Sequence, residues 1–422
     1  MKDMSLIVIV TYNSADFIED CLISIVEQDY REWQLVMVDN DSSDDTVKRI
    51  RHLWNQTTAF NAENFKLIAL RKNIGFARAV NHAVFSSIRT AAGARGEKGY
   101  TKRSSRHNRI LSGKGKRGIS GYSTFAGKSG GGTAGDLFDH LILLNPDICL
   151  LPGALKNLTG TFSQAGGRQI GACGGLILDY EKDVVQHLAG KMTPNFITYH
   201  EGAGINLSSL DKGSSVYDMS PGDEGMSPGG DDISPGDDIS PGDDGISPGY
   251  EGMSPGDDDI SGHAEGIGAI RGELAEADYV TGAFFATRFS LYVKAGGFDS
   301  GYRPLYFEEL DYCLKLKKAG WLIVSNLRAR CRHFEGASVK KFSRRFYRHY
   351  HKNRIRCAVI NLDIPEFIRL FIPAELKWLV RSATRDQARP ILYAYFINIL
   401  FLIYNLSVKI KNYLILNKIE LK

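Results

Sequence analysis

Apolar residues alternate between two patterns along the first 150 positions. Four short and nearly continuous runs predict strands buried on both faces of a sheet, at residues 6–10, 33–38, 65–70 and 141–144. After the first run, apolar residues recur at helical spacing from Phe17 to Val26, and Ser14 is placed to cap this helix. A second amphipathic helix follows the second run. Strand–loop–helix units in succession predict an α/β fold with a mostly parallel sheet.

Polar residues and a glycine follow the predicted strands. In chain order they are Thr11 and Asn13, Asp39, Asn73 and Gly75, and Asn145 and Asp147. The carboxyl ends of parallel strands meet at one sheet edge, where open α/β sheets bind ligands, so we expect a nucleotide there. Asp39 is suited to accept a hydrogen bond from a ribose hydroxyl or a base N–H. It is also placed to cap the next helix with Ser42 and Asp44; we expect both functions, with Asp44 as the purer cap.

The last predicted strand ends in Asn145-Pro146-Asp147. Pro146 removes a ladder donor and favours an extended backbone at Asn145, so Asp147 is held at the rim of the sheet. A carboxylate in this position suits Mg²⁺ or Mn²⁺ that also binds phosphate oxygens. Taken alone, such a triplet usually forms only a turn, so other segments decide its function.

The segment from Asn73 to Ala77 allows the backbone to approach a ligand closely at Gly75. It lacks the full dinucleotide glycine pattern and the Walker lysine. The sequence therefore disfavours a nicotinamide-binding or ATP-binding fold.

Three carboxylates, Glu308, Glu309 and Asp311, occur within four residues and follow two aromatic side chains. Bringing them together is costly unless a cation, a helix N-terminus or a proton relieves the repulsion. A solvated first helical turn is the alternative, which the preceding aromatic residues disfavour. His333 follows a short predicted strand at 322–324, which favours a role at the rim, although a lone histidine is more often structural.

Together these segments resemble the inverting family 2 glycosyltransferases of the GT-A fold, especially the rhamnosyltransferase-like branch. The motifs that carry the resemblance, in family order, are Thr11-Tyr-Asn13, Asp39-Asn-Asp-Ser, Asn73-Ile-Gly-Phe-Ala, Asn145-Pro-Asp147, Gly-Gly-Phe-Asp299 and Glu308-Glu309-Leu-Asp311. They cover roughly residues 4–88, 137–190 and 275–345. Each motif is modest alone, whereas the ordered set is specific. The resemblance implies a GT-A nucleotide-sugar-binding fold with a central, mostly parallel sheet.

The resemblance also implies roles for individual residues. Those expected to face the nucleotide are Thr11, Asn13, Asp39 and Asn73. Asp147 matches the last acidic position of the family's metal-binding Asp-x-Asp triplet, and His333 matches a position that can join the metal. Glu309 matches the general base, with Glu308 and Asp311 as the neighbouring candidate carboxylates.

Two residues depart from the family pattern. Asn145 stands where the triplet usually begins with aspartate, so the metal site has one charge fewer. Either metal affinity is lower, or this first position serves the sugar. Glu309 stands where the family often has aspartate; glutamate reaches one methylene further, so the acceptor geometry could differ.

Length and composition agree with a catalytic domain and additional segments. The 422 residues exceed the roughly 250 needed for one such domain, and the formal net charge of +4 says little. The six cysteines form no CxxC pair and mostly sit in apolar runs, which predicts reduced, buried thiols in a cytosolic compartment. We expect no signal peptide, because the N-terminal apolar run is short.

Two low-complexity segments interrupt the expected catalytic domain, which we place at 1–345. Residues 89–135 are basic, with Glu97 as the only acid, and predict a disordered loop; phosphate binding is the alternative. Residues 204–272 contain six Ser-Pro-Gly repeats between acidic runs and predict a disordered linker. Loose pairing of the two segments is possible. Sparse aromatic residues in the basic segment disfavour nucleic acid as a partner.

Residues 346–422 predict a helical, membrane-associated region. Basic and aromatic residues from Lys340 to Tyr350 precede an uncharged apolar run at 391–408. Polar residues in one helical stripe are Asn398, Asn405, Lys409 and Asn412. The run is at the lower length limit for a span, and the stripe favours a helix in the membrane plane. We expect peripheral binding to the cytoplasmic face of the cell membrane; a true span and a helix docked on the catalytic domain are the alternatives.

These expectations combine into a metal-dependent inverting glycosyltransferase. The donor would be a dTDP- or UDP-sugar, with dTDP-rhamnose as the first expectation and a hexose or galactofuranose as alternatives. The acceptor would be a hydroxyl of a glycan or lipid-linked glycan in cell-surface polysaccharide synthesis. A catalytically silent nucleotide-sugar-binding scaffold is the alternative from another class, which the presence of Asp147, Glu309 and His333 disfavours.

Overall fold

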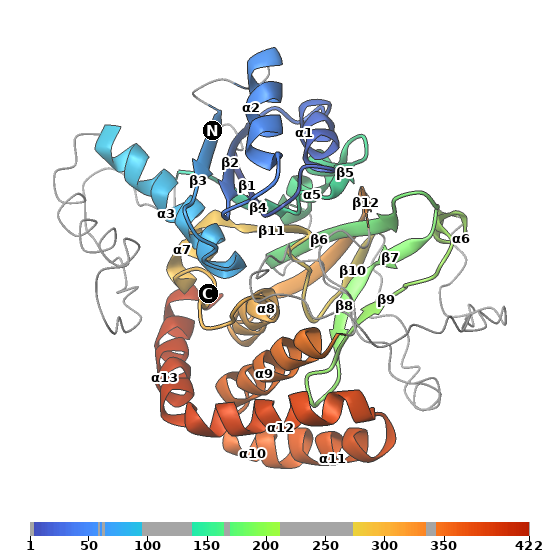
Figure 1. The fold of residues 1–422 in the computed structure, drawn as a ribbon, viewed down its shortest axis with the longest axis vertical. Coiled ribbons are helices and arrows are strands. Elements are labelled where there is room, and N and C mark those ends of the chain that lie inside the picture. The colour runs from blue at the N-terminus through green and yellow to red at the C-terminus, as the bar shows by residue number, and fades with distance from the viewer. Residues whose placement is uncertain are drawn as a thin grey trace.

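The computed structural model describes residues 4–57, 60, 64–94, 137–163, 169–211, 273–334 and 343–421. Residues 95–136 and 212–272, which contain nearly all of the basic and acidic low-complexity segments, lie outside them. A large sheet with helices on both faces forms one part of the molecule, and the C-terminal helices form a layer at the opposite end from α2 (Thr46–Gln56) (Figure 1).

Four parallel strands form one half of the main sheet. Across the sheet their order is β4 (His140–Leu144), β1 (Ser5–Thr11), β2 (Trp33–Asp39) and β3 (Phe65–Ala69). Each confirms a strand predicted from an apolar run to within one residue at either end. Thr11 lies opposite Asp39 in the register, so the loops after β1 and β2 start side by side.

The other half of the sheet is mixed. It continues from β4 through β11 (Phe284–Arg288), β6 (Ile170–Asp179), β12 (Leu322–His333) and β10 (Leu274–Glu276). β11 is antiparallel to both of its neighbours, whereas β12 runs parallel to β6. β5 (Ile148–Leu150) pairs with the end of β12, and β7 (Val185–His187) pairs with β6.

The strand predicted at 322–324 is much longer than expected, because β12 has 12 residues and ends at His333. Its second part alternates Arg328, Arg330 and Arg332 with buried residues. Alternation of polar and buried positions is the pattern of a strand with one exposed face, which a search for continuous apolar runs does not detect.

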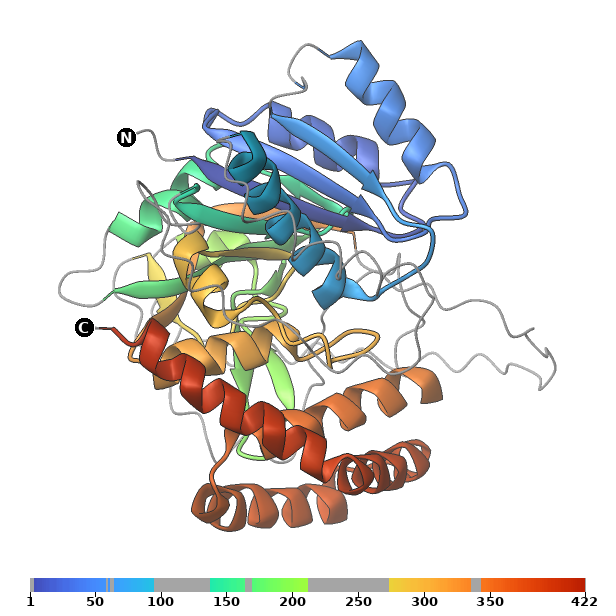
Figure 2. The same cartoon turned by 90° about the vertical axis from the view of Figure 1, so that its left-hand side faces the viewer.

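Two apolar clusters lie on the two faces of the sheet. On one face pack α1 (Ile18–Val26), α2 and α5 (Ala154–Gly160), which a short 3₁₀ turn, Thr161–Ser163, follows. On the other pack α3 (Phe76–Ala94), α7 (Phe289–Ala295) and α8 (Glu308–Lys318). Figure 2 shows helices on both sides of the sheet. Successive residues of β1 alternate between the two clusters, which confirms a strand buried on both faces.

Ser14 does not cap α1, contrary to the prediction. α1 begins only at Ile18, and the Ser14 carbonyl, not its hydroxyl, accepts from the backbone N–H groups of Phe17 and Ile18. The Ser14 hydroxyl instead lies against the backbone of Tyr12, while its N–H donates to Thr46 Oγ1 over 2.7 Å. Ser14 therefore orders the loop after β1 rather than the helix.

A small second sheet and the C-terminal helices complete the described chain. The sheet pairs β8 (Ala189–Met192) with β9 (Thr198–Glu201), which α6 (Leu207–Asp211) follows. The C-terminal elements are α9 (Arg344–Asn361), α10 (Ile364–Glu366), a π-helical turn (Phe367–Phe371), α11 (Ile372–Arg381), α12 (Arg385–Leu400) and α13 (Leu402–Ile419).

We expect one helix from the apolar run at 391–408, but the structure does not form a single helix there. The run is divided between α12 and α13, whose axes differ by 71° at a break at Phe401. The bend lets α12 pack along α9 while α13 reaches α7 and α8, which a single straight helix could not do.

All six cysteines are free, and five of them are buried, which confirms the expectation of buried thiols. Burial raises the pKa of the Cys173 thiol to about 12 and that of the Cys313 thiol to about 12. Both side chains are therefore neutral, unreactive parts of the core at ordinary pH.

Candidate active site

Hydrogen bonds join the loops that follow β1 and β2. Thr11 Oγ1 donates to Asp39 Oδ1 over 3.1 Å, and the N–H of Ser42 donates to Asp39 Oδ2 over 3.1 Å. Asp39 is buried and orders this loop; among the described contacts it does not cap α2. Asp44 accepts from the N–H of Thr46, the first residue of α2, over 3.0 Å, but the N-cap residue of α2 is Asp45, whose side chain makes no capping hydrogen bond.

Asparagine side chains extend this network across three loops. Asn13, with a left-handed φ of 48°, accepts from the N–H of Ser43 over 2.8 Å. Asn40 donates to Asn73 Oδ1 over 2.9 Å, and the same oxygen accepts from the N–H of Gly75 over 2.9 Å. The predicted nucleotide-facing residues of β1, β2 and β3 thus belong to one hydrogen-bonded edge.

Gly75 brings a distant segment to this edge. A Cβ at this position would lie 2.9 Å from the carbonyl oxygen of Pro304, and the φ of 81° also favours glycine. The loop before α8 therefore packs directly on the loop after β3. We expect the backbone at Gly75 to approach a ligand closely; in this structure it approaches the backbone of Pro304.

The predicted Asn145-Pro-Asp147 segment lies at the end of β4 and leads into β5. Asn145 is anchored by its N–H, which donates to the carbonyl oxygen of Ala283 over 3.0 Å. Asp147 is only 5 % exposed, and its carbonyl oxygen accepts from the N–H of Phe334 over 3.0 Å. Backbone bonds on both sides thus fix the position of this segment.

Asp147 and His333 form a buried pair. Asp147 Oδ1 lies 3.5 Å from His333 Nε2, and neither atom has a hydrogen-bond partner within the described residues. His333 Nδ1 lies 2.9 Å from Gln186 Oε1, and Gln186 Nε2 donates to the His333 carbonyl oxygen over 3.3 Å. A proton on Nδ1 that is donated to Gln186 leaves the Nε2 lone pair directed at Asp147.

The two facing atoms of this pair are of types that bind a divalent cation. A carboxylate oxygen and an imidazole nitrogen, both buried and lacking other hydrogen-bond partners in the described structure, are suitable ligands. Across the described ranges, no group of three or more His, Cys, Asp or Glu side chains is arranged to hold a metal ion. The remaining ligands would therefore be water and oxygen atoms of the substrate.

Glu308, Glu309 and Asp311 form the first turn of α8, and none is more than 1 % exposed, so the alternative of a solvated turn is wrong. Tyr306 and Phe307 both have a φ of 78°, which is rare for bulky residues and costs of the order of 1–3 kcal/mol each. Such backbone strain persists only where its surroundings enforce it. The helix N-terminus also favours negative charge at this turn.

Asn353 of α9 holds this strained turn. Its Nδ2 donates to the carbonyl oxygens of Leu305, over 2.8 Å, and Tyr306, over 3.1 Å. Phe307 also contacts the ring of Tyr350 from the same helix, with centroids 5.2 Å apart. α9 thereby fixes the backbone from which the three carboxylates project.

Glu309 and Glu308 face different surroundings. A Cβ at Gly282 would collide with Glu309 Oε1, so the Glu309 carboxyl lies against the backbone next to Ala283. Burial and the charge of Arg356 are the main causes that lower the pKa of Lys352 to about 8, and the Glu308 charge opposes this shift. Glu309 is therefore directed toward the strand ends, whereas Glu308 acts on Lys352 of α9.

Asp311 has two strong partners. Lys315 Nζ lies 2.6 Å from its Oδ2, and Asn361 Nδ2 donates to its Oδ1 over 2.8 Å. The structure thus brings together Glu309 and the Asn145 segment, while Asp311 is bound on the side of α9.

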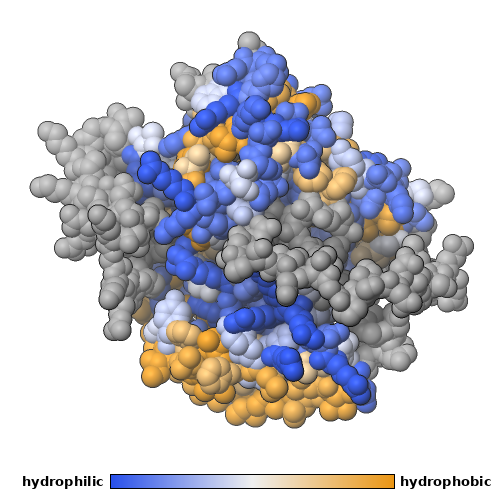
Figure 3. Space-filling view, in the orientation of Figure 1, coloured by the Kyte–Doolittle hydropathy of each residue, from blue (hydrophilic) through white to orange (hydrophobic). Residues whose placement is uncertain are grey.

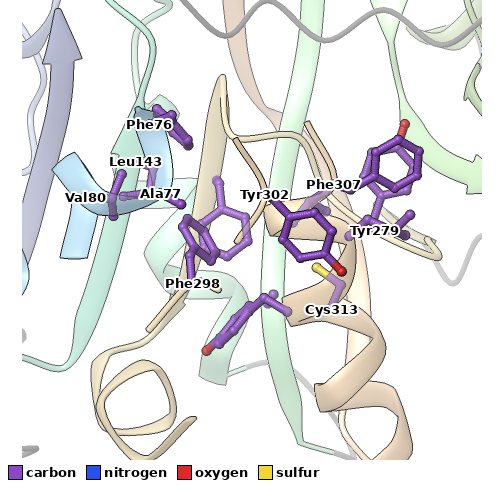
Figure 4. Packing of buried hydrophobic residues seen from close by; sticks show 14 of the residues in the cluster. Phe76, Ala77, Val80, Leu143, Tyr279, Phe298, Tyr302, Phe307 and Cys313 are labelled. Atoms are coloured by element: carbon purple, nitrogen blue, oxygen red, sulfur yellow. The ribbon is translucent and has the colours of Figure 1, made fainter. Parts of the chain in front are cut away.

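Aromatic residues pack in the core around α8 and the segment before it. Phe76 on α3, Phe298 and Phe307 belong to one apolar cluster around α8, together with Tyr302 and Cys313 (Figure 4). The rings of Phe76 and Phe298 have centroids 6.4 Å apart. These contacts link the helix after β3 with the segment before Glu308.

Sequence analysis missed three residues that shape the site. Gly282 follows Val280-Thr281 just before β11, and nothing local showed what approaches it. Asn353 shares the spacing of four residues with Cys357 and Asn361, which marks one face of a helix. Gln186 has no local signal, because its contact with His333 depends on the pairing of distant strands.

A family model agrees with the N-terminal part of this architecture. The model described as Glycosyl transferase family 2 matches residues 6–87, which run from β1 into α3. This match bears out the expected enzyme class, a glycosyltransferase, together with the GT-A-like α/β fold class. No curated protein matches the chain.

Solved structures of glycosyltransferases resemble the chain at low sequence identity. A structure of S. aureus TarS 1-349 shows 12 % identity and a TM-score of 0.42, covering 97 % of this chain and 89 % of that one. The mannosyltransferase PcManGT from Pyrobaculum calidifontis, in complex with GDP-Man and Mn²⁺, shows 12 % identity and a TM-score of 0.38, covering 98 % and 86 %. GalNAc-T7 with UDP, GalNAc and Mn²⁺ shows 12 % identity and a TM-score of 0.45; the match covers 85 % of this chain but only 48 % of that one.

Proposed function

We propose that the protein is a metal-dependent inverting glycosyltransferase that uses a nucleotide-diphosphate sugar. The observation that carries this proposal is the position of Glu309, whose carboxyl lies against Gly282. The adjacent Ala283 is hydrogen-bonded to Asn145, at the strand end that bears Asp147. A buried carboxyl group and a candidate metal pair thus flank one short backbone segment.

The donor nucleotide would occupy the edge formed by the loops after β1, β2 and β3. Thr11, Asn13, Asp39 and Asn73 are the residues that we assign to it. The hydrogen bonds between these loops support the assignment, because a preorganised edge loses little conformational entropy when it binds a ligand. Gly75 would contribute by fixing the loop before α8.

Asp147 and His333 would hold the divalent cation. When bound, the cation would offset the negative charge that grows on the departing diphosphate. The nitrogen ligand favours Mn²⁺ over Mg²⁺, which prefers oxygen ligands only. Asn145, which replaces an acidic residue of the family pattern, would leave this site with lower charge and direct its amide to the sugar.

Glu309 would act as the general base. It would accept the proton of the acceptor hydroxyl while that oxygen forms a bond to the anomeric carbon. The bond from this carbon to the diphosphate oxygen breaks on the opposite face, and its electron pair leaves with the diphosphate. Asp311 would not accept the proton, because Lys315 and Asn361 bind it; it would position the first turn of α8.

Resemblance of the motifs supports a deoxysugar such as rhamnose as the donor sugar, with a dTDP- or UDP-linked hexose or galactofuranose as the alternative. The acceptor would be a hydroxyl of a glycan or a lipid-linked glycan.

A donor screen tests the proposal. Purified full-length protein is heated with dTDP-, UDP- and GDP-sugars in the presence of Mn²⁺, and release of nucleoside diphosphate is measured in parallel. We expect one nucleotide class to raise the melting temperature and its sugar to be hydrolysed slowly, with both effects lost in a chelator. Stabilisation without any turnover of any donor would support the scaffold alternative instead.

A further inference from the structure

The C-terminal helices expose an unusually large apolar surface, which we call the C-terminal apolar face. Its most exposed members are Ile364, Val380, Leu392, Ile399, Ile403 and Tyr413, each between 67 % and 86 % exposed. Figure 3 shows this surface as a continuous hydrophobic band at the end of the molecule where Figure 1 places α10 to α13. Soluble monomers rarely expose continuous apolar surface of this extent, which marks an interaction site.

The polar stripe of the same helices faces inward. Asn398, Asn405 and Asn412 are 6 %, 2 % and 8 % exposed. Asn398 Nδ2 donates to the carbonyl oxygen of Lys352 over 2.9 Å, and Asn405 Nδ2 donates to Asn398 Oδ1 over 3.1 Å. α12 and α13 are therefore docked on the protein partly through these polar groups, while many of their apolar side chains face outward.

A buried ion pair fixes this arrangement to the rest of the molecule. The Arg354 guanidinium binds both carboxylate oxygens of Glu375, over 2.5 and 2.6 Å, and donates to the Asn195 carbonyl oxygen over 2.7 Å. Tyr395 of α12 also donates to Glu375. The helices that carry the C-terminal apolar face are thus joined to α9 and to the β8–β9 connection.

We propose that the C-terminal apolar face docks on a lipid bilayer that contains anionic lipids. Residues 344–422 contain 15 lysine and arginine residues against five acidic ones. The excess of positive charge remains when the buried residues Arg354, Arg356 and Glu375 are set aside, which suits an anionic surface. Arg369, Arg385 and Arg389 are exposed on or beside the helices that carry the face. An apolar layer bordered by cations is the composition of helices that lie in the membrane interface.

A hollow within the face favours lipid over a protein partner. It has a volume of about 400 Å³ and is lined almost entirely by apolar atoms of α9, α10, the π-helical turn, α12 and α13, including Ile355, Phe367, Ile399 and Leu406. A flexible hydrocarbon chain can enter such a hollow, whereas a flat protein surface would leave it unfilled.

The face lies on the bilayer and does not cross it. In the described part of the chain, no single helix is long and apolar enough to span a membrane, and α12 with α13 passes that test only as a bent pair. Crossing would also separate Asn398 from the Lys352 carbonyl oxygen of α9. This docking is independent of the proposed glycosyl transfer, so its test needs no donor.

Vesicle flotation of the full-length protein tests the proposal. We expect binding to vesicles of phosphatidylcholine with phosphatidylglycerol, weaker binding to phosphatidylcholine alone, and only partial release by high salt. Ile399→Ser/Ile403→Ser should reduce binding at least about tenfold, because it removes apolar area from the exposed side. Ile23→Ser, at an exposed apolar residue of α1, is the matched control and should bind as the wild type does.

A charge variant separates the electrostatic contribution to vesicle binding from the apolar one. Arg369→Ala/Arg389→Ala should reduce the preference for anionic vesicles, and Lys48→Ala/Arg51→Ala on α2 should not. Absence of vesicle binding, or equal losses in the control variants, would overturn the proposal. So would a lipid-free dimer, seen in sedimentation, that dissociates in Ile399→Ser/Ile403→Ser, because a second copy would then cover the face.

Discussion

His333 Nε2 faces Asp147 Oδ1 at 3.5 Å inside the protein. The proximity follows from strand pairing, because β5 starts directly after Asp147 and pairs with the end of β12, where His333 lies opposite Ile148. The two side chains come from distant parts of the sequence, yet backbone hydrogen bonds determine their spacing. Gln186 then sets the orientation of the imidazole ring.

Asp147→Asn should abolish transfer and leave the fold intact. The amide has the shape of the carboxylate but supplies no charge for a cation, so we expect transfer to fall by at least roughly 100-fold. Transfer with Mn²⁺ and the Mn²⁺-dependent shift in melting temperature are the measurements. Asp386→Asn, at an exposed residue of α12, is the control. Wild-type transfer in excess chelator would refute a metal role for Asp147.

Asn353→Ala should weaken both stability and turnover. It leaves the buried carbonyl oxygens of Leu305 and Tyr306 without this donor, at a cost of about 1–3 kcal/mol in the free energy of unfolding. The turn that carries Glu309 should relax, so kcat should fall while donor affinity changes little. Urea unfolding and steady-state kinetics measure these effects, with Asn417→Ala, at an exposed residue, as the control. Unchanged kcat would show that α9 does not position the turn.

Arg354→Met should be among the most destabilising substitutions in the C-terminal layer. It leaves Glu375 buried without its charge partner, and breaking such a pair costs about 3–5 kcal/mol. Arg354→Met/Glu375→Leu should recover much of the loss, since neither charge then remains. Unfolding free energies of both variants provide the check. A double variant less stable than Arg354→Met would contradict the view that the unpaired carboxylate causes the loss.

Stability should fall as the pH is lowered through about 6.5, the ordinary pKa of histidine. Burial is the main cause that holds the pKa of His187 and of His351 well below this value. Both are neutral when folded and take up protons when unfolded below about pH 6.5, so their contribution is present above this pH and lost below it. Each histidine contributes a slope of up to about 1.4 kcal/mol per pH unit.

Urea unfolding between about pH 8 and pH 5 measures this slope. His351→Gln should reduce the slope, whereas His52→Gln, at an exposed residue of α2, should not. A stability that is constant over this range would show that neither buried histidine stays neutral in the folded protein.

Local patterns predicted the strands and the residues at their ends well. β1, β2, β3 and β4 follow from continuous apolar runs, because each strand is buried on both faces and needs no distant information. Glu308, Glu309 and Asp311 are buried, as the aromatic residues that precede them indicate.

Features that depend on distant contacts could not be predicted. The break at Phe401 lets α12 pack along α9 while α13 also reaches α7 and α8, and the apolar run does not show these contacts. The asparagine stripe was recognised, but its inward direction depends on Lys352 of α9. Ser14 has the chemistry of a helix cap, yet its hydroxyl is hydrogen-bonded to the backbone of Tyr12 instead. The different surroundings of Glu308 and Glu309 likewise became visible only through the contact of Glu309 with Gly282, which is distant in the sequence.

The most direct test of the account is the rate of sugar transfer by Glu309→Gln, measured with donor affinity on the same protein. The amide keeps the shape of the side chain but cannot accept the acceptor's proton. We therefore predict a loss of about 10²–10⁴-fold in transfer, with donor affinity nearly unchanged. Glu308→Gln should retain more activity, and Glu276→Gln, at an exposed edge residue, should match the wild type. An active Glu309→Gln together with a crippled Glu308→Gln would contradict the assignment of the base.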